Sequence, residues 1–330
     1  MWGRRLLAAL AVGVPLLFLL PGVAAADPAP APAASCTAGA YVTDVWNVSP
    51  ESGLFSARVW LWTVCPDAAT EVLQSASLPN ADTVDKSMYS VTPKGGRTWS
   101  EILLQGTFKH RFDASNFPFD RDELDIVLTA PFGATGFRYR PDTANSTFDP
   151  KIQISGWRIT GYHVTTVEQG YPTTFGDPTV PAGQSSIYCR LYVRITVARS
   201  DPTTFWRVTG PMFIAWMVSF ITFLFVLDAD GLEGAIGALG AALFAVMLNL
   251  QQADSLNPSA HGLSLIDRLH LLTMLYIVLA LSASVAAWRA NRRGADRATV
   301  RRRTFQTLVA STAGYFLVIG WFVVSAARQG

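Results

Sequence analysis

The 330-residue chain contains little charge. Asp, Glu, Lys and Arg together make up 15% of the residues, whereas half of the residues are hydrophobic and the mean hydropathy is +0.27. A chain of this composition is not a purely soluble globule. The formal net charge of +2 is small, and we expect no nucleic-acid partner.

The sequence also lacks the common signatures of catalysis. It has no Ser–His–Asp or Cys–His grouping in a suitable context and no phosphate-binding loop. The four histidines are scattered at spacings that suit no metal site, namely His110, His163, His261 and His270. For His270, which falls in an apolar segment, we weighed packing, contact with a neighbouring helix and proton sensing. We therefore expect a protein that is not an enzyme and uses no cofactor and no metal.

Cysteine is scarce, and its use depends on the compartment. Residues 1–26 have the basic start, apolar core and small-residue cleavage site of a signal peptide, with a retained membrane anchor as the alternative. Residues 27–40 form a Pro/Ala-rich tether and the start of the first strand. Export permits disulfides. A hairpin centred near residue 51 places Cys36 opposite Cys65, which predicts a disulfide; two free thiols are the alternative, and Cys189 is left as a packed strand residue.

Residues 41–204 are rich in short apolar-alternating runs separated by turn signals, which predicts an extracellular β-sandwich of immunoglobulin-like type. Residues 205–330 contain four apolar segments and predict a four-helix transmembrane bundle, with spans near 208–227, 234–253, 266–288 and 305–327. The stretch RANRRGADRATVRRR between the last two spans has seven arginines and one aspartate. Since arginine-rich loops stay in the cytoplasm, we expect a multi-pass protein of the plasma (inner) membrane whose N-terminal domain is extracellular or periplasmic.

Four local stretches, in this order, carry a resemblance to a known family: FPFDRDEL, LYVRITVARSDPTTFW, Pro211 in the first helix, and LNPSAHGLSLIDRLHLLTMLY. The layout and these stretches resemble the pentameric ligand-gated ion channels (the Cys-loop receptor superfamily) in their bacterial form. The resemblance implies a ring-shaped homopentamer in membrane lipid, a small-molecule agonist of unknown identity that binds between extracellular domains, and permeant ions.

The resemblance also implies a pore lined by the second helix. Steps of three or four residues place one set of side chains on one helix face, namely Glu233, Gly237, Ala241, Phe244, Leu248, Gln251 and Ser255. Five copies of Glu233 would form an acidic ring that favours cations, although Glu233 can equally stabilise a helix N-terminus. Rings of Phe244 and Leu248 would gate the pore by excluding water.

The ligand pocket and the coupling zone follow from the same resemblance. Aromatic side chains around a cavity can hold a cation, and the candidates are Phe132, Phe137, Tyr139, Tyr171, Phe175 and Tyr188. The expected coupling residues, which transmit binding to the pore, are Glu51, Phe117, Pro118, Phe119, Asp120, Arg199 and Pro258. The aromatic loop at Phe117–Phe119 should rest on the loop after the second helix, near Ser255–Ser264.

We therefore expect a ligand-gated ion channel, cation-selective through Glu233. The Gly/Ala-rich second helix and the short, polar segment Cys65–Arg97 keep an alternative open, which is a membrane-anchored ligand-binding sensor of the same fold that does not conduct.

Overall fold

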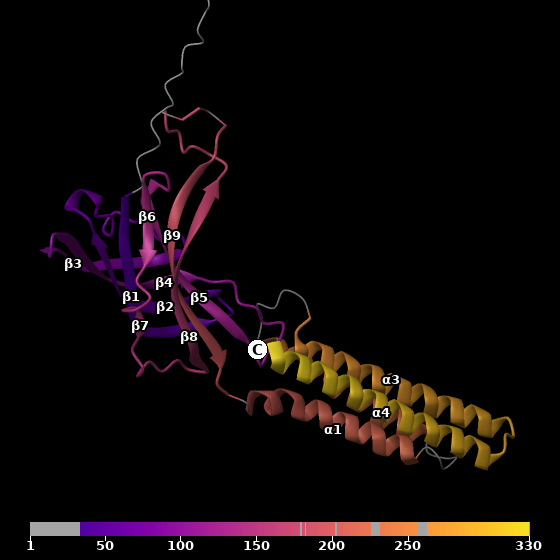
Figure 1. Cartoon of the computed structure of the whole chain (residues 1–330). Coiled ribbons are helices and arrows are strands. Elements are labelled where there is room, and N and C mark those ends of the chain that lie inside the picture. The colour runs from indigo at the N-terminus through magenta and orange to yellow at the C-terminus, as the bar shows by residue number, and fades with distance from the viewer. Residues whose placement is uncertain are drawn as a thin grey trace, which may run out of the picture. The chain divides into compact units, whose positions relative to one another are not determined.

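The computed structural model describes residues 34–329, except 179, 182, 202, 226–231 and 256–262. The expected signal peptide and most of the tether therefore lie outside the described residues, as does Pro258. The expected β-rich part forms nine strands in two sheets (Figure 1). The strands are β1 (Ala34–Ser49), β2 (Leu54–Cys65), β3 (Ala81–Lys94), β4 (Arg97–Lys109), β5 (Arg121–Gly133), β6 (Phe137–Pro141), β7 (Thr147–Phe148), β8 (Trp157–Tyr171) and β9 (Ser186–Arg199).

One sheet has six strands in the order β3-β4-β2-β1-β6, with β7 paired to β1; the other has three in the order β5-β9-β8. Alternation along β9 shows why they stack. Leu191, Val193 and Ile195 are buried, while the residues between them are partly exposed. Side chains of a strand point alternately to its two faces, so this apolar face packs in one core with β1, β2 and β4. A sandwich of two layers is the result.

The predicted disulfide is confirmed. β1 and β2 pair antiparallel with Thr37 opposite Val64, so Cys36 falls opposite Cys65 and the two are bonded. Cys189 is a buried free cysteine, as expected.

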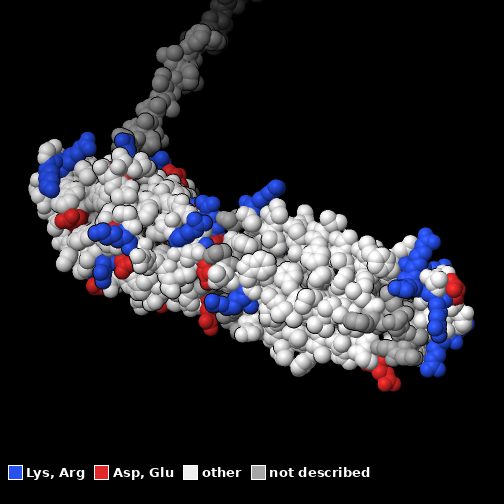
Figure 2. All heavy atoms as spheres, turned by 90° about the horizontal axis from the view of Figure 1, so that it is seen from below, with Lys and Arg blue, Asp and Glu red and all other residues white. Residues whose placement is uncertain are grey.

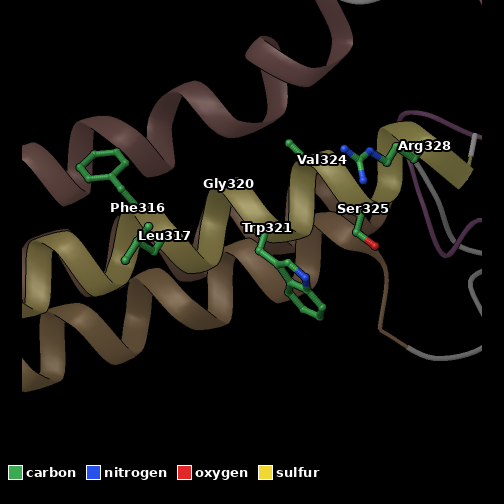
Figure 3. A pocket seen from close by; sticks show the side chains of 7 residues that line it. All are labelled: Phe316, Leu317, Gly320, Trp321, Val324, Ser325 and Arg328. Atoms are coloured by element: carbon green, nitrogen blue, oxygen red, sulfur yellow. The ribbon is translucent and has the colours of Figure 1, made fainter.

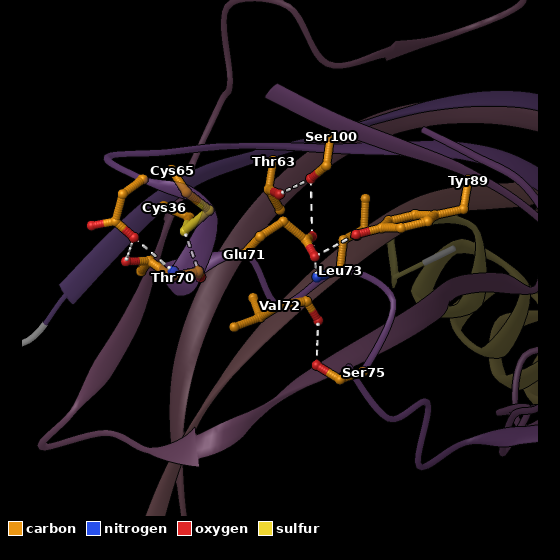
Figure 4. Close-up of a disulfide and its surroundings, with 11 residues drawn as sticks. Cys36, Thr63, Cys65, Thr70, Glu71, Val72, Leu73, Ser75, Tyr89 and Ser100 are labelled. Atoms are coloured by element: carbon orange, nitrogen blue, oxygen red, sulfur yellow. Dashed lines mark hydrogen bonds between the residues drawn. A yellow bond between two sulfur atoms is a disulfide. The ribbon is translucent and has the colours of Figure 1, made fainter. Parts of the chain in front are cut away.

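The polar segment that follows Cys65 is anchored by one carboxylate (Figure 4). Glu71 Oε1 accepts from the Leu73 backbone N–H at 2.5 Å and from Ser100 Oγ at 2.9 Å. Glu71 Oε2 accepts from the Tyr89 hydroxyl at 2.6 Å. Hydrogen bonds to an ionised acceptor are stronger than neutral ones, and they hold this segment against β3 and β4.

Four helices follow the sandwich: α1 (Thr203–Phe225), α2 (Leu232–Ser255), α3 (Leu265–Arg292) and α4 (Arg297–Gln329). α3 begins with a capping box, in which Ser264 Oγ accepts from the Asp267 N–H and the Asp267 carboxylate accepts from the Ser264 N–H. It ends before Gly294, whose φ of +78° suits glycine. The arginines Arg301–Arg303, expected in a loop, lie instead in the first turns of α4, because Asp296 accepts from the Thr299 N–H and starts that helix early.

The expectation of a four-helix transmembrane bundle is wrong in this structure. Within the described residues three helices are long and apolar enough to cross a membrane, with spans at Leu232–Ala253, Leu265–Arg292 and Arg297–Arg328. α1 is not among them. The expected span 208–227 contains no charged residue before its end, but residues 226 and 227 lie outside the described residues.

The three apolar helices make this a membrane protein. Figure 2 shows Lys and Arg gathered at the α3–α4 turn and a surface almost without charge along the helices. Large side chains such as Leu317 and Trp321 of α4 are exposed there, at 75% and 66%. Exposed apolar surface of this extent is expected of helices in contact with lipid.

Candidate functional site

The aromatic loop at Phe117–Phe119 packs on α1 and α3, whereas most of the segment on which it was expected to rest, Ser255–Ser264, lies outside the described residues. Phe117 is 1% exposed and shares a cluster with Phe205 and Met212 of α1 and Leu269 of α3. The rings of Phe119 and Phe205 lie 5.6 Å apart. The apolar side chains that a turn of the sandwich would otherwise expose are therefore buried against the helices.

A backbone hydrogen bond reinforces this contact. The Leu265 N–H, the first of α3, donates to the Ser115 carbonyl at 2.9 Å. The first N–H groups of a helix have no partner inside the helix, so the loop before β5 satisfies a group that would otherwise need water. The start of α3 is thus bonded directly to the sandwich. It directly follows Ser255–Ser264, the segment that the resemblance implies in coupling.

Asp120 and Arg199 form a buried ion pair beside the same loop. Arg199 Nε donates to Asp120 Oδ2 at 2.9 Å, and Asp120 is 3% exposed. The Arg199 guanidinium also lies over two rings, 4.8 Å from the centre of Phe117 and 4.7 Å from that of Trp157. Planar Arg groups stack well on aromatic faces.

The charge of Asp120 is costly at this position. Burial raises the pKa of Asp120 to about 6; Arg199 lowers it, and the nearby carboxylates Asp122 and Asp113 raise it further. Asp120 Oδ1 has no hydrogen-bond partner among the described residues. A cavity of about 460 Å³ opens next to the pair and is also lined by Arg158 and Asp201.

Glu51 does not join this pair. It is exposed in the turn between β1 and β2 and forms no ion pair in the part of the chain that the structure describes. Of the charged residues expected in the coupling zone, only Asp120 and Arg199 are therefore paired with each other among the described residues. The reason is that Arg199 is directed to Asp120, Phe117 and Trp157.

α2 buries one face and leaves the opposite face open. Leu239 and Val246 are fully buried against α1 and α3. The residues predicted to line a pore are exposed on the other side: Glu233, Gly237, Ala241, Phe244, Leu248 and Gln251. Phe244 and Leu248 have exposed fractions of 63% and 49%. Ser255 ends the helix on the same stretch.

A buried polar bridge holds α2 between its neighbours. Asn249 Nδ2 donates to the Val208 carbonyl of α1 at 2.7 Å and lies 2.7 Å from His270 Nε2 of α3. His270 Nδ1 lies 2.8 Å from the Ile266 carbonyl, which can only accept. The proton of a neutral His270 thus sits on Nδ1 and Nε2 accepts from Asn249. Of the alternatives for His270, packing and contact with a neighbouring helix are both observed, since the side chain is fully buried and contacts Asn249.

The six predicted ligand-binding aromatics lie in three different surroundings. Phe137 and Tyr139 lie in the sandwich core, 1% and 3% exposed, because β6 turns both toward the inner face. They do not line an open pocket, which corrects the expectation for them. Phe132 is 52% exposed at the end of β5.

The other three aromatics cluster at the β8–β9 hairpin. Tyr171, Phe175 and Tyr188 lie edge to face, with ring centres 5.2 to 5.8 Å apart. Arg190, which our reading of the sequence missed, belongs to this cluster: its guanidinium lies 5.5 Å from the centre of the Tyr171 ring and donates to the Tyr171 hydroxyl. Alternation along β9 could have indicated it, since Tyr188 and Arg190 are two residues apart on one face.

A shallow groove of about 570 Å³ lies along the outer side of α4 (Figure 3). Phe316 at one end contacts Trp216 of α1, with ring centres 4.8 Å apart. Ser325 and Arg328 lie at the other end, and the side chains between them are mainly apolar.

A comparison with known protein families and with curated proteins found no match to this chain.

Proposed function

We propose that the chain is the subunit of a ligand-gated ion channel of the pentameric type, in which several copies surround a pore lined by α2. The observation that carries this proposal is the open face of α2. Glu233 and Gln251 lie near the two ends of this exposed stripe, where polar side chains suit the mouths of a water-filled path. A ring of copies would place the stripe around water.

The packed face of α2 supports the same assignment. Asn249 and Val246 hold α2 against α1 and α3, so the other described helices cannot cover the open face without breaking these contacts. Neighbouring copies are the partners that this geometry suits.

The ends of α3 support one orientation in the membrane. Its first residue is bonded to Ser115 of the sandwich, and its last turn contains Arg289 and Arg292. α2 runs antiparallel to α3, since Asn249 meets His270 while Leu239 packs with Ile277 and Ala280. By the positive-inside rule, these arginines support an extracellular or periplasmic sandwich.

The contacts of the aromatic loop supply a route for coupling. Arg199 ends β9, the strand that carries Tyr188, and stacks on Phe117, which is buried among α1 and α3. A ligand that shifts the β8–β9 hairpin would act on the helices through this stack. The ligand would shift the free-energy difference between the closed and open states by the difference between its binding free energies for the two states.

Cysteine accessibility tests the pore directly. Ala241 is on the open face and Ala242, 5% exposed, is on the packed face. We expect a membrane-impermeant charged thiol reagent to modify Ala241→Cys and block current in reconstituted bilayers, and to leave Ala242→Cys unaffected. Val309→Cys on α4, exposed at 51%, controls for a lipid-facing position and should stay unmodified.

The non-conducting sensor is the alternative that one observation favours. Phe244 is bulky and lies in the middle of the open face, so a ring of five could close the path completely. Silence under every ligand, with Ala241→Cys unmodified, would establish the sensor in place of the channel. In a conducting channel, Glu233→Gln should lower the preference for cations, and an unchanged reversal potential would remove Glu233 from the filter.

A further inference from the structure

Arg190 and Arg194 of β9 lie four residues apart on the outer face of the three-stranded sheet, and their partners differ. Arg194 is held by two carboxylates: Asp125 accepts at 2.6 and 2.9 Å, and Glu123 lies at 2.7 Å. Arg190 forms no ion pair within the described residues. Because a guanidinium stays protonated in proteins, the charge of Arg190 is not balanced by a carboxylate.

The contacts of Arg190 are with neutral oxygens. Its guanidinium donates to the hydroxyl of Tyr171 and lies 3.5 Å from both the Tyr192 hydroxyl and Gln169 Oε1. Its Nε is buried and has no hydrogen-bond partner among the described residues. A buried donor without a partner is unfavourable, so the neighbours of Arg190 leave part of its hydrogen-bonding capacity unsatisfied.

An apolar wall stands beside this charge. Phe175 is 61% exposed and packs edge to face on Tyr171 and Tyr188. Exposed aromatic rings next to a few placed polar groups are typical of small-molecule sites. The wall and the guanidinium together present an apolar surface with one fixed positive end.

We propose that Arg190 with Tyr171, Phe175 and Tyr188 binds a small carboxylate whose apolar body packs on the rings. This inference rests on the proposed function for its role in gating. Guanidinium and carboxylate form two parallel hydrogen bonds in a planar fork. The aromatic cluster was expected to hold a cationic ligand, but Arg190 already places a cation against Tyr171, so a second positive charge is repelled.

A series of probes with one aromatic body and different charge tests the ligand class. Phenylacetate, phenylacetamide and phenethylammonium are titrated by calorimetry into the purified full-length chain in lipid nanodiscs. We expect phenylacetate to bind saturably and the other two at least about tenfold more weakly, since a charge-assisted pair is lost. Amide or amine binding as tight as that of phenylacetate overturns the proposal, as does the lack of saturable phenylacetate binding up to about 10 mM.

Variants then assign the binding to this site. Arg190→Gln should lose phenylacetate affinity by about tenfold or more, and Arg190→Lys, which keeps the charge without the fork, should fall between. Arg97→Gln, at the exposed β3–β4 turn, is the matched control and should bind as the parent does. Phe175→Ala alters only an exposed ring, so it tests the wall even if Arg190→Gln does not fold. Parent-like affinity in both Arg190→Gln and Phe175→Ala overturns the proposal, and so does an Arg190→Gln variant that changes only the oligomeric state.

Binding and current separate this inference from the proposed channel. Phenylacetate binding that depends on Arg190 but evokes no current would support the binding site and contradict the proposed channel. Current that a different class of ligand evokes, and that Arg190→Gln leaves unchanged, would support the channel and contradict the proposed carboxylate site.

Discussion

Asp120 and Arg199 are joined twice across the boundary between β5 and β9. The Arg199 N–H donates to the Asp120 carbonyl at 3.1 Å, and Arg199 Nε donates to the Asp120 carboxylate at 2.9 Å. The first bond fixes the backbones and the second fixes the charges. Truncating one partner of such a buried pair leaves the other charge uncompensated, which costs far more than the pair itself contributes.

The first prediction concerns the pH dependence of Asp120. Its pKa rises from the ordinary 3.8 to about 6 because of burial, so between these values the folded chain binds a proton that the unfolded chain has released. Protonation of Asp120 therefore contributes roughly 3 kcal/mol to the free energy of unfolding. This contribution is complete below pH 4 and is lost as the pH rises through 6. We expect Asp120→Asn to remove this component from the free energy of unfolding measured against pH in detergent.

Asp82→Asn provides the matched control, because the Asp82 side chain is 42% exposed and pairs only with Lys109 at the surface. It should keep the slope of the parent. An Asp120→Asn variant with the parental slope between pH 4 and 6 would show that Asp120 does not titrate there.

The second prediction concerns the disulfide. Cys36 and Cys65 are separated by 29 positions, and closing a loop of that length restricts the unfolded chain by about 3–4 kcal/mol in the chain-entropy account. We expect the double variant Cys36→Ser/Cys65→Ser to lose stability of that order in chemical denaturation. Reductant should destabilise the parent and Cys189→Ala alike but leave the double variant unchanged; equal sensitivity in all three would contradict the assignment.

The described fold shows what sequence patterns can and cannot predict. Alternation predicted the two sheets, hairpin register predicted the Cys36–Cys65 bond, and the position of Phe117 between a strand and apolar segments predicted its burial against helices. These features depend on local geometry and on a one-dimensional pattern. α1 was predicted as a span from composition alone, and the end of that predicted span lies outside the described residues.

The candidate sites were harder to predict because they depend on tertiary neighbours. The alternation Phe137-Arg138-Tyr139-Arg140 indicates that the two aromatics share one strand face. It does not show which structure covers that face, or that Asn249 meets His270. The partners of Arg190 and Arg194 differ only because β5 places Asp125 opposite Arg194 and Thr129 opposite Arg190. Strand register decides that contrast, and a single sequence does not reveal it.

The third prediction separates the two faces of α2. Val246 is fully buried against the neighbouring helices, whereas Phe244 is 63% exposed. Val246→Ala should therefore lower the resistance of the chain to unfolding in detergent, because packing is the main attraction between membrane helices. Phe244→Ala should leave that resistance unchanged and raise single-channel conductance severalfold, since a bulky apolar ring is removed from the path. Reduced stability with unchanged conductance in Phe244→Ala would place this face in a protein contact.

The fourth prediction concerns the bridge between Asn249 and His270. Since Asn249 donates to Val208 and to His270 at 2.7 Å each, its removal should loosen α1, α2 and α3 together. In a double-mutant cycle with Asn249→Ala and His270→Ala, we expect a coupling energy of about 0.6–1.7 kcal/mol, which is the range of hydrogen bonds between membrane helices. Ser282→Ala serves as the control partner for Asn249→Ala, because Ser282 donates only to Val278 of its own helix, and that cycle should be additive. Unfolding in mixed detergent micelles measures both cycles. Additivity of Asn249→Ala with His270→Ala would mean that the 2.7 Å contact between the two side chains contributes nothing to holding α2 against α3.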